Sequence, residues 1–116
     1  MGLAAIPSGS AQTYTVLYTF TGGSDGEFPA AALIQDSAGN LYGTTSYGNP
    51  PRAGSVFSLS LSGKFKVLHS FKTGGADGAR PFASLVRDPA GNLYGTTIEG
   101  GGSGSGTVFK LEEGQL

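Results

Sequence analysis

The segment Asp36-Ser-Ala-Gly-Asn-Leu-Tyr-Gly-Thr-Thr45 occurs again, almost unchanged, as Asp88-Pro-Ala-Gly-Asn-Leu-Tyr-Gly-Thr-Thr97. Its first half predicts a hairpin turn, because Asp can hydrogen-bond the backbone that follows it and because Gly and Asn tolerate positive φ. Its second half, Leu-Tyr-Gly-Thr-Thr, predicts a short β-strand. The chain is therefore organised around two copies of one turn-and-strand unit.

Three further segments repeat on either side of this unit. Residues 16–20 return as 67–71, residues 22–26 return as 74–78, and residues 54–59 return as 106–111. The offset is 51 residues before a one-residue insertion in the first loop and 52 residues after it, and about half of the aligned positions are identical. A fixed internal period of this length is typical of repeat folds, so we expect both copies to have the same structure.

Each copy predicts four short strands, since runs of β-branched, aliphatic and aromatic residues alternate with Gly-rich turns. The predicted strands are residues 14–20, 31–35, 41–46 and 54–61 in the first copy, and 65–71, 83–87, 93–98 and 106–111 in the second. Four antiparallel strands per repeat are typical of a β-propeller blade. We therefore predict an all-β chain of two four-stranded antiparallel propeller blades, with repeat 1 at 14–64 and repeat 2 at 65–116, which are not independent domains.

The order of the predicted strands has a consequence for assembly. If residues 31–35 form the innermost strand, then residues 65–71 form the outermost strand of the first blade, and the second blade ends at its third strand. Residues 14–20 of the next copy would supply the missing outer strand. Propeller rings need roughly four to eight blades, so we predict a homo-oligomer closed by exchange of the N-terminal strand, with four chains or three chains.

The composition excludes several classes of function. The chain has 21 Gly, no Cys, 13% charged residues and a net charge of −1. Without a basic stripe it is not expected to bind nucleic acid. Without Cys it has no disulfides and no thiolate metal ligands. It has no apolar run of about 18 residues, so no membrane span is predicted, and no motif indicates a cofactor or a metal.

The first 13 residues read as a leader rather than as part of the repeat. The small residues that end in Ser-Ala-Gln12 are similar to the end of a secretory signal peptide, although the charged region and most of the apolar region are missing. We expect a truncated export signal and a secreted or extracellular protein, which includes the periplasm. The alternative is an unstructured leader or a remnant of cloning.

The repeated motifs Asp-Gly-x-x-Pro, Asp-x-Ala-Gly-Asn-Leu-Tyr-Gly-Thr-Thr and Gly-Thr-Val-Phe-x-Leu resemble the Gloeo-Verruco (GloVer) tandem repeat over about residues 14–116. The resemblance implies a secreted bacterial protein with many such repeats, often beside surface-anchoring segments. It brings no catalytic residue, and the molecular function of the family is largely undefined. This chain has only two copies, so a fragment of a longer repeat protein, a designed chain and a natural small oligomer all remain open.

The candidate binding residues lie in the connections that should emerge together at one end of each blade. These connections are 21–29 and 72–81, between outer and inner strands, and 47–53 and 99–105, between second and third strands. Loops at one end of a propeller often form its binding surface. The polar and aromatic candidates there are Asp25, Tyr47, Arg52, Asp77, Arg80 and Glu99, together with Glu27.

Each of these candidates has a structural reading beside a functional one. Asp25 and Asp77, within Gly-Gly-x-Asp-Gly, could ligate calcium, but one carboxylate per loop favours a turn-stabilising role. Arg80 is expected to pair with Asp77, or else to offer donors, as Arg52 could, to an anionic or sugar ligand. Tyr47 could stack on a sugar ring.

No catalytic constellation is predicted. His69 aligns with Tyr18 in the other copy, which argues against a catalytic histidine. The paired threonines 44, 45, 96 and 97 have no base nearby in sequence and are expected to make cross-strand hydrogen bonds. We predict a non-enzymatic structural or interaction scaffold that self-assembles. The alternatives are a glycan-binding propeller, with a glycan or surface polymer as partner, and an enzyme that uses Asp25, Asp77 and Glu99 as acids.

Overall fold

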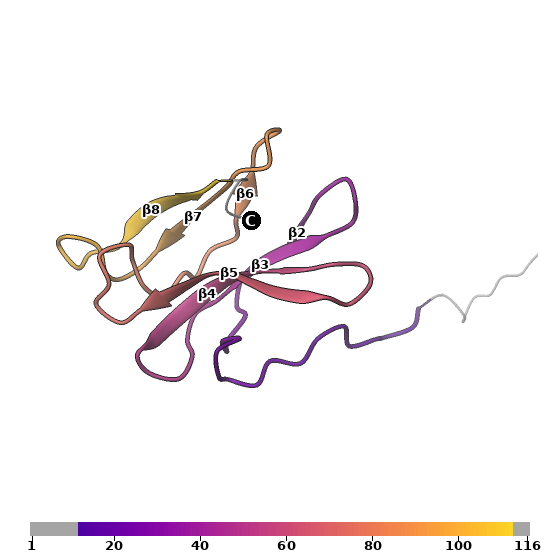
Figure 1. Cartoon of the computed structure of the whole chain (residues 1–116), viewed down its shortest axis with the longest axis horizontal. Coiled ribbons are helices and arrows are strands. Elements are labelled where there is room, and N and C mark those ends of the chain that lie inside the picture. Colours follow the sequence, from indigo (N-terminus) through magenta and orange to yellow (C-terminus); the bar gives the residue numbers. More distant parts are fainter. Residues whose placement is uncertain (1–11, 113–116) are drawn as a thin grey trace, which may run out of the picture.

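The structure, a computed structural model, describes residues 12–112, and these form two antiparallel β-sheets without a helix (Figure 1). The first sheet has the order β2 (Ile34–Gln35), β3 (Leu41–Thr45), β4 (Arg52–Leu59) and β5 (Phe65–Lys72). The second sheet has the order β6 (Val86–Arg87), β7 (Leu93–Thr97) and β8 (Thr107–Leu111). The predicted all-β class and the order of strands are confirmed. Most of the predicted leader lies outside the described residues.

The predicted strand at residues 14–20 is wrong, because this segment belongs to neither sheet. A strand needs a neighbour whose N–H and C=O groups it can pair with. The repeat assigns that role to a strand equivalent to β4 in a preceding blade, and the described chain contains no such blade. The second sheet accordingly has three strands, so the prediction of two four-stranded sheets holds for the first sheet only.

The innermost strands are shorter than predicted, since residues 31–35 and 83–87 reduce to β2 and β6, of two residues each. The segments that lead into β2 and β6 lie outside the sheets. Each contains a residue with positive φ at an equivalent position, Phe28 (φ 60°) and Arg80 (φ 58°). A proline without an N–H follows each of them. The backbone therefore stays away from β3 and β7, and only the two residues of β2 and of β6 pair with them.

The predicted hairpin turns are confirmed, and each is organised by its aspartate. The Asp36 carboxylate accepts hydrogen bonds from Ala38 N at 3.0 Å, Asn40 N at 2.9 Å and Tyr42 Oη at 3.0 Å. Partial desolvation opposes ionisation, but these donors outweigh it and hold the pKa of Asp36 below its usual value. At Asp88 the hydrogen bonds, led by that of the Asn92 side chain, lower the pKa to about 2.

Each sheet has two faces, which we name by their side chains. The leading face of the first sheet carries Leu41, Phe57 and Leu59, and that of the second carries Leu93, Phe109 and Leu111. The trailing face of the first sheet carries Tyr42, Thr44 and Val56, and that of the second carries Tyr94, Thr96 and Val108. This assignment follows from the strand register, which places Leu41 opposite Leu59 and Thr44 opposite Val56, because successive side chains point to opposite faces.

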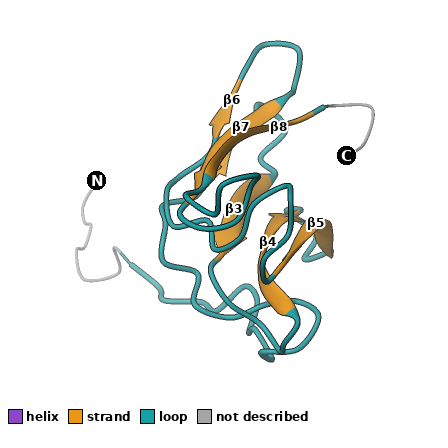
Figure 2. Ribbon diagram, turned by 90° about the vertical axis from the view of Figure 1, so that its left-hand side faces the viewer, coloured by secondary structure: helices purple, strands orange, loops and turns teal. Residues whose placement is uncertain are grey.

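The core lies where the trailing face of the first sheet packs against the leading face of the second. Tyr42 and Val56 contribute from the first sheet, and Leu93 and Leu111 contribute from the second. Figure 2 shows the two sheets one above the other, with the connecting loops running between them. Two hydrogen bonds fix the connection before β6 to the first repeat, from Ser46 Oγ to the Pro81 carbonyl at 2.8 Å and from Arg80 N to the Ala53 carbonyl at 2.7 Å.

Gly43 and Gly95 allow a phenylalanine of the neighbouring strand to lie across each leading face. A Cβ at Gly43 would lie 2.7 Å from Phe57 Cζ, and a Cβ at Gly95 would lie 2.6 Å from Phe109 Cζ. Beyond these glycines the strands are joined by the predicted hydroxyl pairs, Thr45 with Ser55 at 2.7 Å and Thr97 with Thr107 at 2.8 Å. Thr44 differs from the prediction, since its buried hydroxyl has no partner.

Candidate functional site

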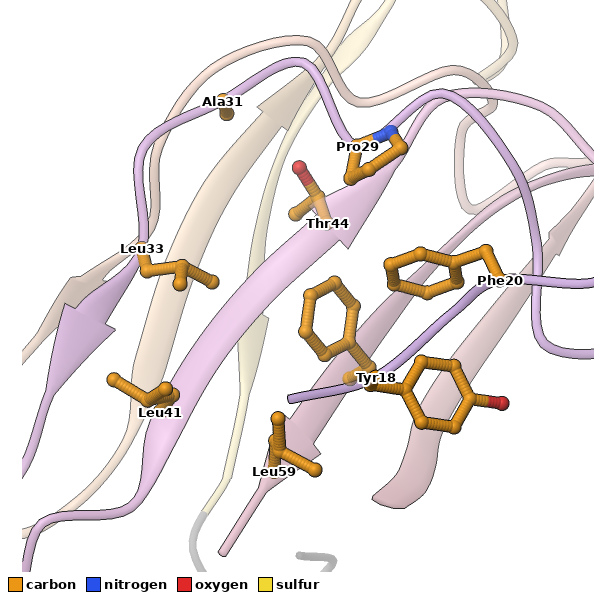
Figure 3. A pocket seen from close by; sticks show the side chains of 9 residues that line it. Tyr18, Phe20, Pro29, Ala31, Leu33, Leu41, Thr44 and Leu59 are labelled. Carbon is orange, nitrogen blue, oxygen red and sulfur yellow. The ribbon is translucent and has the colours of Figure 1, made fainter. Parts of the chain in front are cut away.

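The leading face of the first sheet is an open apolar groove with a volume of about 300 Å³. Leu33, Leu41 and Leu59 line it, and Tyr18 and Phe20 lie along one side (Figure 3). The equivalent face of the second sheet is covered by the first sheet. The contrast lies at Leu33, which is 51% exposed whereas its equivalent Leu85 is 2% exposed; Phe57 and Leu59, on the floor of the groove, are already buried at 5% and 6% exposure.

The trailing face of the second sheet is exposed in the same way. Val108 is 83% exposed, whereas its equivalent Val56 is fully buried between the sheets. Val86 is 65% exposed, and Thr96 is exposed although its equivalent Thr44 is buried. The chain thus presents two unlike apolar faces, and each resembles one half of the interface that the two sheets already form.

Residues 14–20 lie against the groove in the way that β5 lies against the second sheet. The ring centroids of Phe20 and Phe57 are 5.2 Å apart, and those of the equivalent Phe71 and Phe109 are 5.4 Å apart. Figure 1 shows this N-terminal part of the chain running beside the first sheet. The segment therefore has the position of an outer strand from a preceding blade, without the rest of that blade.

Asp25 fixes the N-terminal segment to the loop that follows it. Its carboxylate accepts hydrogen bonds from Tyr18 Oη at 2.7 Å, Thr21 N at 3.0 Å and Thr21 Oγ1 at 2.6 Å. Burial opposes the ionised form, but these donors outweigh burial and lower the pKa of Asp25 to about 2. With its oxygens engaged by donors of the chain, Asp25 has the geometry of a turn-stabilising carboxylate.

Asp77 makes the equivalent contact in the second repeat, with a different partner. His69 Nε2 lies 2.7 Å from Asp77 Oδ2, as the Tyr18 hydroxyl lies 2.7 Å from Asp25. The alignment of His69 with Tyr18 therefore has a structural cause, because each aromatic side chain ties an outer segment to the next Gly-Gly-x-Asp-Gly loop.

The expected pairing of Arg80 with Asp77 is wrong. Arg80 Nε instead donates to Glu99 Oε1 at 3.0 Å, and its guanidinium lies 4.4 Å from the centroid of the Tyr47 ring. The positive φ of Arg80 and the pairing of the two connections, through Ala79 N and the Glu99 carbonyl at 2.8 Å, place Arg80 beside Glu99.

Three of the predicted candidates, Tyr47, Arg80 and Glu99, thus meet two residues outside the predicted set, Phe28 and Phe82. The Tyr47 ring packs edge to face on Phe28 at 5.2 Å and on Phe82 at 6.0 Å. We call these five side chains the aromatic platform. Phe28 precedes the proline of the first Asp-Gly-x-x-Pro motif and Phe82 follows that of the second, so an aromatic residue beside a loop proline was the available signal.

Arg52, the remaining candidate, lies elsewhere, at the start of β4 and opposite Lys72 of β5. Within residues 12–112 no three histidine or acidic side chains gather in a way that could hold a metal ion. The same part of the chain contains no helix that is long and apolar enough to cross a membrane.

A family model described as the Gloeobacter/Verrucomicrobia repeat matches residues 6–116. No curated protein matches the chain.

Proposed function

The chain belongs to the Gloeobacter/Verrucomicrobia repeat family, and we propose that it is a non-enzymatic secreted scaffold whose copies join head to tail into a closed β-propeller. The observation that carries the proposal is the contrast within one chain between Val56, which is fully buried, and Val108, which is 83% exposed. Apolar faces of this kind mark association surfaces in soluble proteins.

The two exposed faces are complementary because the internal interface already joins surfaces of the same kind. There, Val56 and Tyr42 of a trailing face pack against Leu85, Leu93 and Leu111 of a leading face. In the assembly, Val108 and Tyr94 of one copy would pack against the groove of the next copy. Such a head-to-tail contact uses two different patches, and it closes into a ring when the rotation per copy allows it.

The N-terminal segment supplies the strand that the second sheet lacks. It already lies on its own groove through Phe20, so it need not detach from its own chain. In the ring, β8 of the preceding copy would form backbone hydrogen bonds with this segment. The register follows from β4 and β5, in which Val56 faces His69 and Phe57 faces Val67; the equivalent pairs between copies are Val108 with Tyr18 and Phe109 with Val16.

Ring closure also removes a hazard of the single chain. The edge of β8 has no strand partner among the described residues, and an unpaired edge is a template for uncontrolled strand addition. A ring pairs this edge in every copy. With two blades per chain, rings of roughly four to eight blades contain two to four chains, and we propose four chains or three chains.

A cysteine crosslink tests this register without interference, because the chain contains no Cys. Ser58 faces Lys66 in the internal pairing, so Lys110 should face Thr15 of the next copy. Directly opposed Cβ atoms lie about 4.5–5.5 Å apart, close to the distance that a disulfide spans. The variant with Thr15→Cys and Lys110→Cys should therefore form intermolecular disulfides up to the closed ring.

The matched control places the first cysteine four residues along the same segment, as Thr19→Cys with Lys110→Cys. Four strand residues span roughly 13 Å, so this variant should crosslink poorly. Denaturing gels with and without reductant measure both variants. Equal crosslinking of the two, or a native mass of 11.7 kDa for the unmodified chain, would contradict the proposal.

A second candidate function is binding of a glycan or surface polymer at the loop end of the blades. One observation favours it, namely that Tyr47, Arg80 and Glu99 meet in the aromatic platform. A screen of immobilised glycans tests it, and the absence of any bound glycan would remove it.

A further inference from the structure

We propose that the aromatic platform is a binding site for a neutral sugar ring, with one site in each chain. The proposal deepens the second candidate function and rests on it, and it does not rest on ring closure, because all five side chains belong to one chain.

The apolar part of the site is formed by rings that project from the connecting loops. Phe28 is 62% exposed and Phe82 is 38% exposed, and both pack edge to face on Tyr47. The connecting loops gather at one end of the sheets, opposite the tight turns (Figure 1). In the proposed ring Phe28 would border the joint with the preceding copy, as its equivalent Arg80 borders the internal joint, whereas Tyr47 and Phe82 lie at the internal joint, which assembly does not change. The apolar face of a pyranose matches such aromatic surfaces in size and polarity.

The polar part of the site is a donor and an acceptor held side by side. Arg80 is fixed by its bond from Nε to Glu99 at 3.0 Å and by its stacking on Tyr47 at 4.4 Å. These contacts leave the terminal nitrogens of the guanidinium and the second carboxylate oxygen of Glu99 for a ligand. Neighbouring sugar hydroxyls can each donate and accept, so a diol can bridge Arg80 and Glu99.

The charge at the site favours a neutral sugar over an acidic one. Arg80 is already paired with Glu99 at 3.0 Å, so the positive charge at the site is neutralised within the chain. A uronate would meet the Glu99 carboxylate there, and like-charge contacts oppose binding.

The backbone prepares the site before a ligand arrives. Phe28 and Arg80 have φ of 60° and 58°, a conformation that is rare for bulky residues and that often accompanies binding sites. Hydrogen bonds from Ser46 N to the Phe28 carbonyl at 3.1 Å and from Ile98 N to the Arg80 carbonyl at 3.1 Å hold both positions. Little ordering is then required when the sugar binds.

The repeat determines how many sites a ring would carry. The equivalents of Tyr47 and Phe82 are Glu99 and Ala30, so the joint between copies has no matching aromatic cluster. Sites would occur at every second blade junction, one per chain. A polymeric glycan could span several of them, which raises the apparent affinity.

Titration calorimetry with neutral hexasaccharides of glucose, mannose and galactose, and with hexagalacturonate, tests the proposal. We expect at least one neutral hexasaccharide to bind with one site per chain, and to bind more tightly than hexagalacturonate. Phe82→Ala and Arg80→Gln should each weaken that binding about tenfold or more. Arg52→Gln, which changes an exposed arginine outside the platform, should leave the binding unchanged.

Four outcomes overturn the proposal: no neutral hexasaccharide binds, hexagalacturonate binds more tightly, the stoichiometry departs from one per chain, or Phe82→Ala leaves the affinity unchanged. Circular dichroism shows whether Arg80→Gln has kept its fold, and Phe82→Ala, at a more exposed position, carries the test if it has not. Val108→Lys separates this proposal from assembly, because a chain that stays monomeric should still bind one hexasaccharide. If the wild-type chain assembles but binds no neutral sugar, the proposed sugar site is refuted and the proposed ring is not.

Discussion

Val108→Lys should break the proposed assembly while leaving the single chain folded. In the chain alone Val108 is 83% exposed, so a lysine there meets water. An exposed substitution usually changes the free energy of unfolding by no more than about 0.5 kcal/mol. In the assembly the same position would be buried, as Val56 is between the two sheets.

The size of the effect follows from that exposed fraction. Burying a whole valine side chain is worth about 1.5–3 kcal/mol. The contact between copies would remove the exposed 83% of the Val108 side chain from water, which is worth about 1.2–2.5 kcal/mol. Losing that contribution weakens each joint roughly 8- to 70-fold. The lysine ammonium must also be desolvated, which adds several kcal/mol when it has no partner.

Light scattering behind size exclusion and native mass spectrometry, over a range of protein concentrations, measure the result. Wild type should have three or four times the chain mass of 11.7 kDa, and Val108→Lys should have the mass of one chain. Leu61→Lys is the matched control, since Leu61 is 75% exposed beside the turn after β4, and it should assemble like wild type. If Val108→Lys assembles as wild type does, the reasoning from the internal interface fails.

Two further predictions concern the single chain. Gly43→Ala should lower the free energy of unfolding, measured by urea titration, by about 1–3 kcal/mol, because the added Cβ would lie 2.7 Å from Leu33 and from Phe57. Gly102 has open space around it, so the control Gly102→Ala should change the free energy of unfolding by less than about 0.5 kcal/mol. Asp25, whose pKa is lowered to about 2, stabilises the fold when ionised. Wild type should therefore lose its stability advantage over Asp25→Asn as the pH falls from about 4 to about 2, and an advantage independent of pH would contradict this role.

The candidate site could be predicted only in part, because its residues lie far apart in the sequence. Tyr47, Arg80 and Glu99 are predictable as candidates because they are polar or aromatic residues in long, Gly-rich loops. Their assembly into one site depends on contacts over long sequence separations, such as Tyr47 with Phe82 and Arg80 with Glu99. Arg80 was expected to bond its neighbour in sequence, Asp77, but the backbone at φ 58° and the pairing of the two connections place it elsewhere.

The sequence by itself determined the turns, the central strands and the order of strands in the first sheet. These depend on local hydrogen bonds, such as those of Asp36 and Asp88, and on a period that is visible as a duplication. Tertiary structure alone decided what becomes of the segment at residues 14–20 and which apolar faces stay open. A strand forms only where a partner edge is present, and a valine is buried only where another sheet covers it. Val56 and Val108 occupy equivalent places in the repeat, and only the packing of the sheets makes one of them core and the other surface.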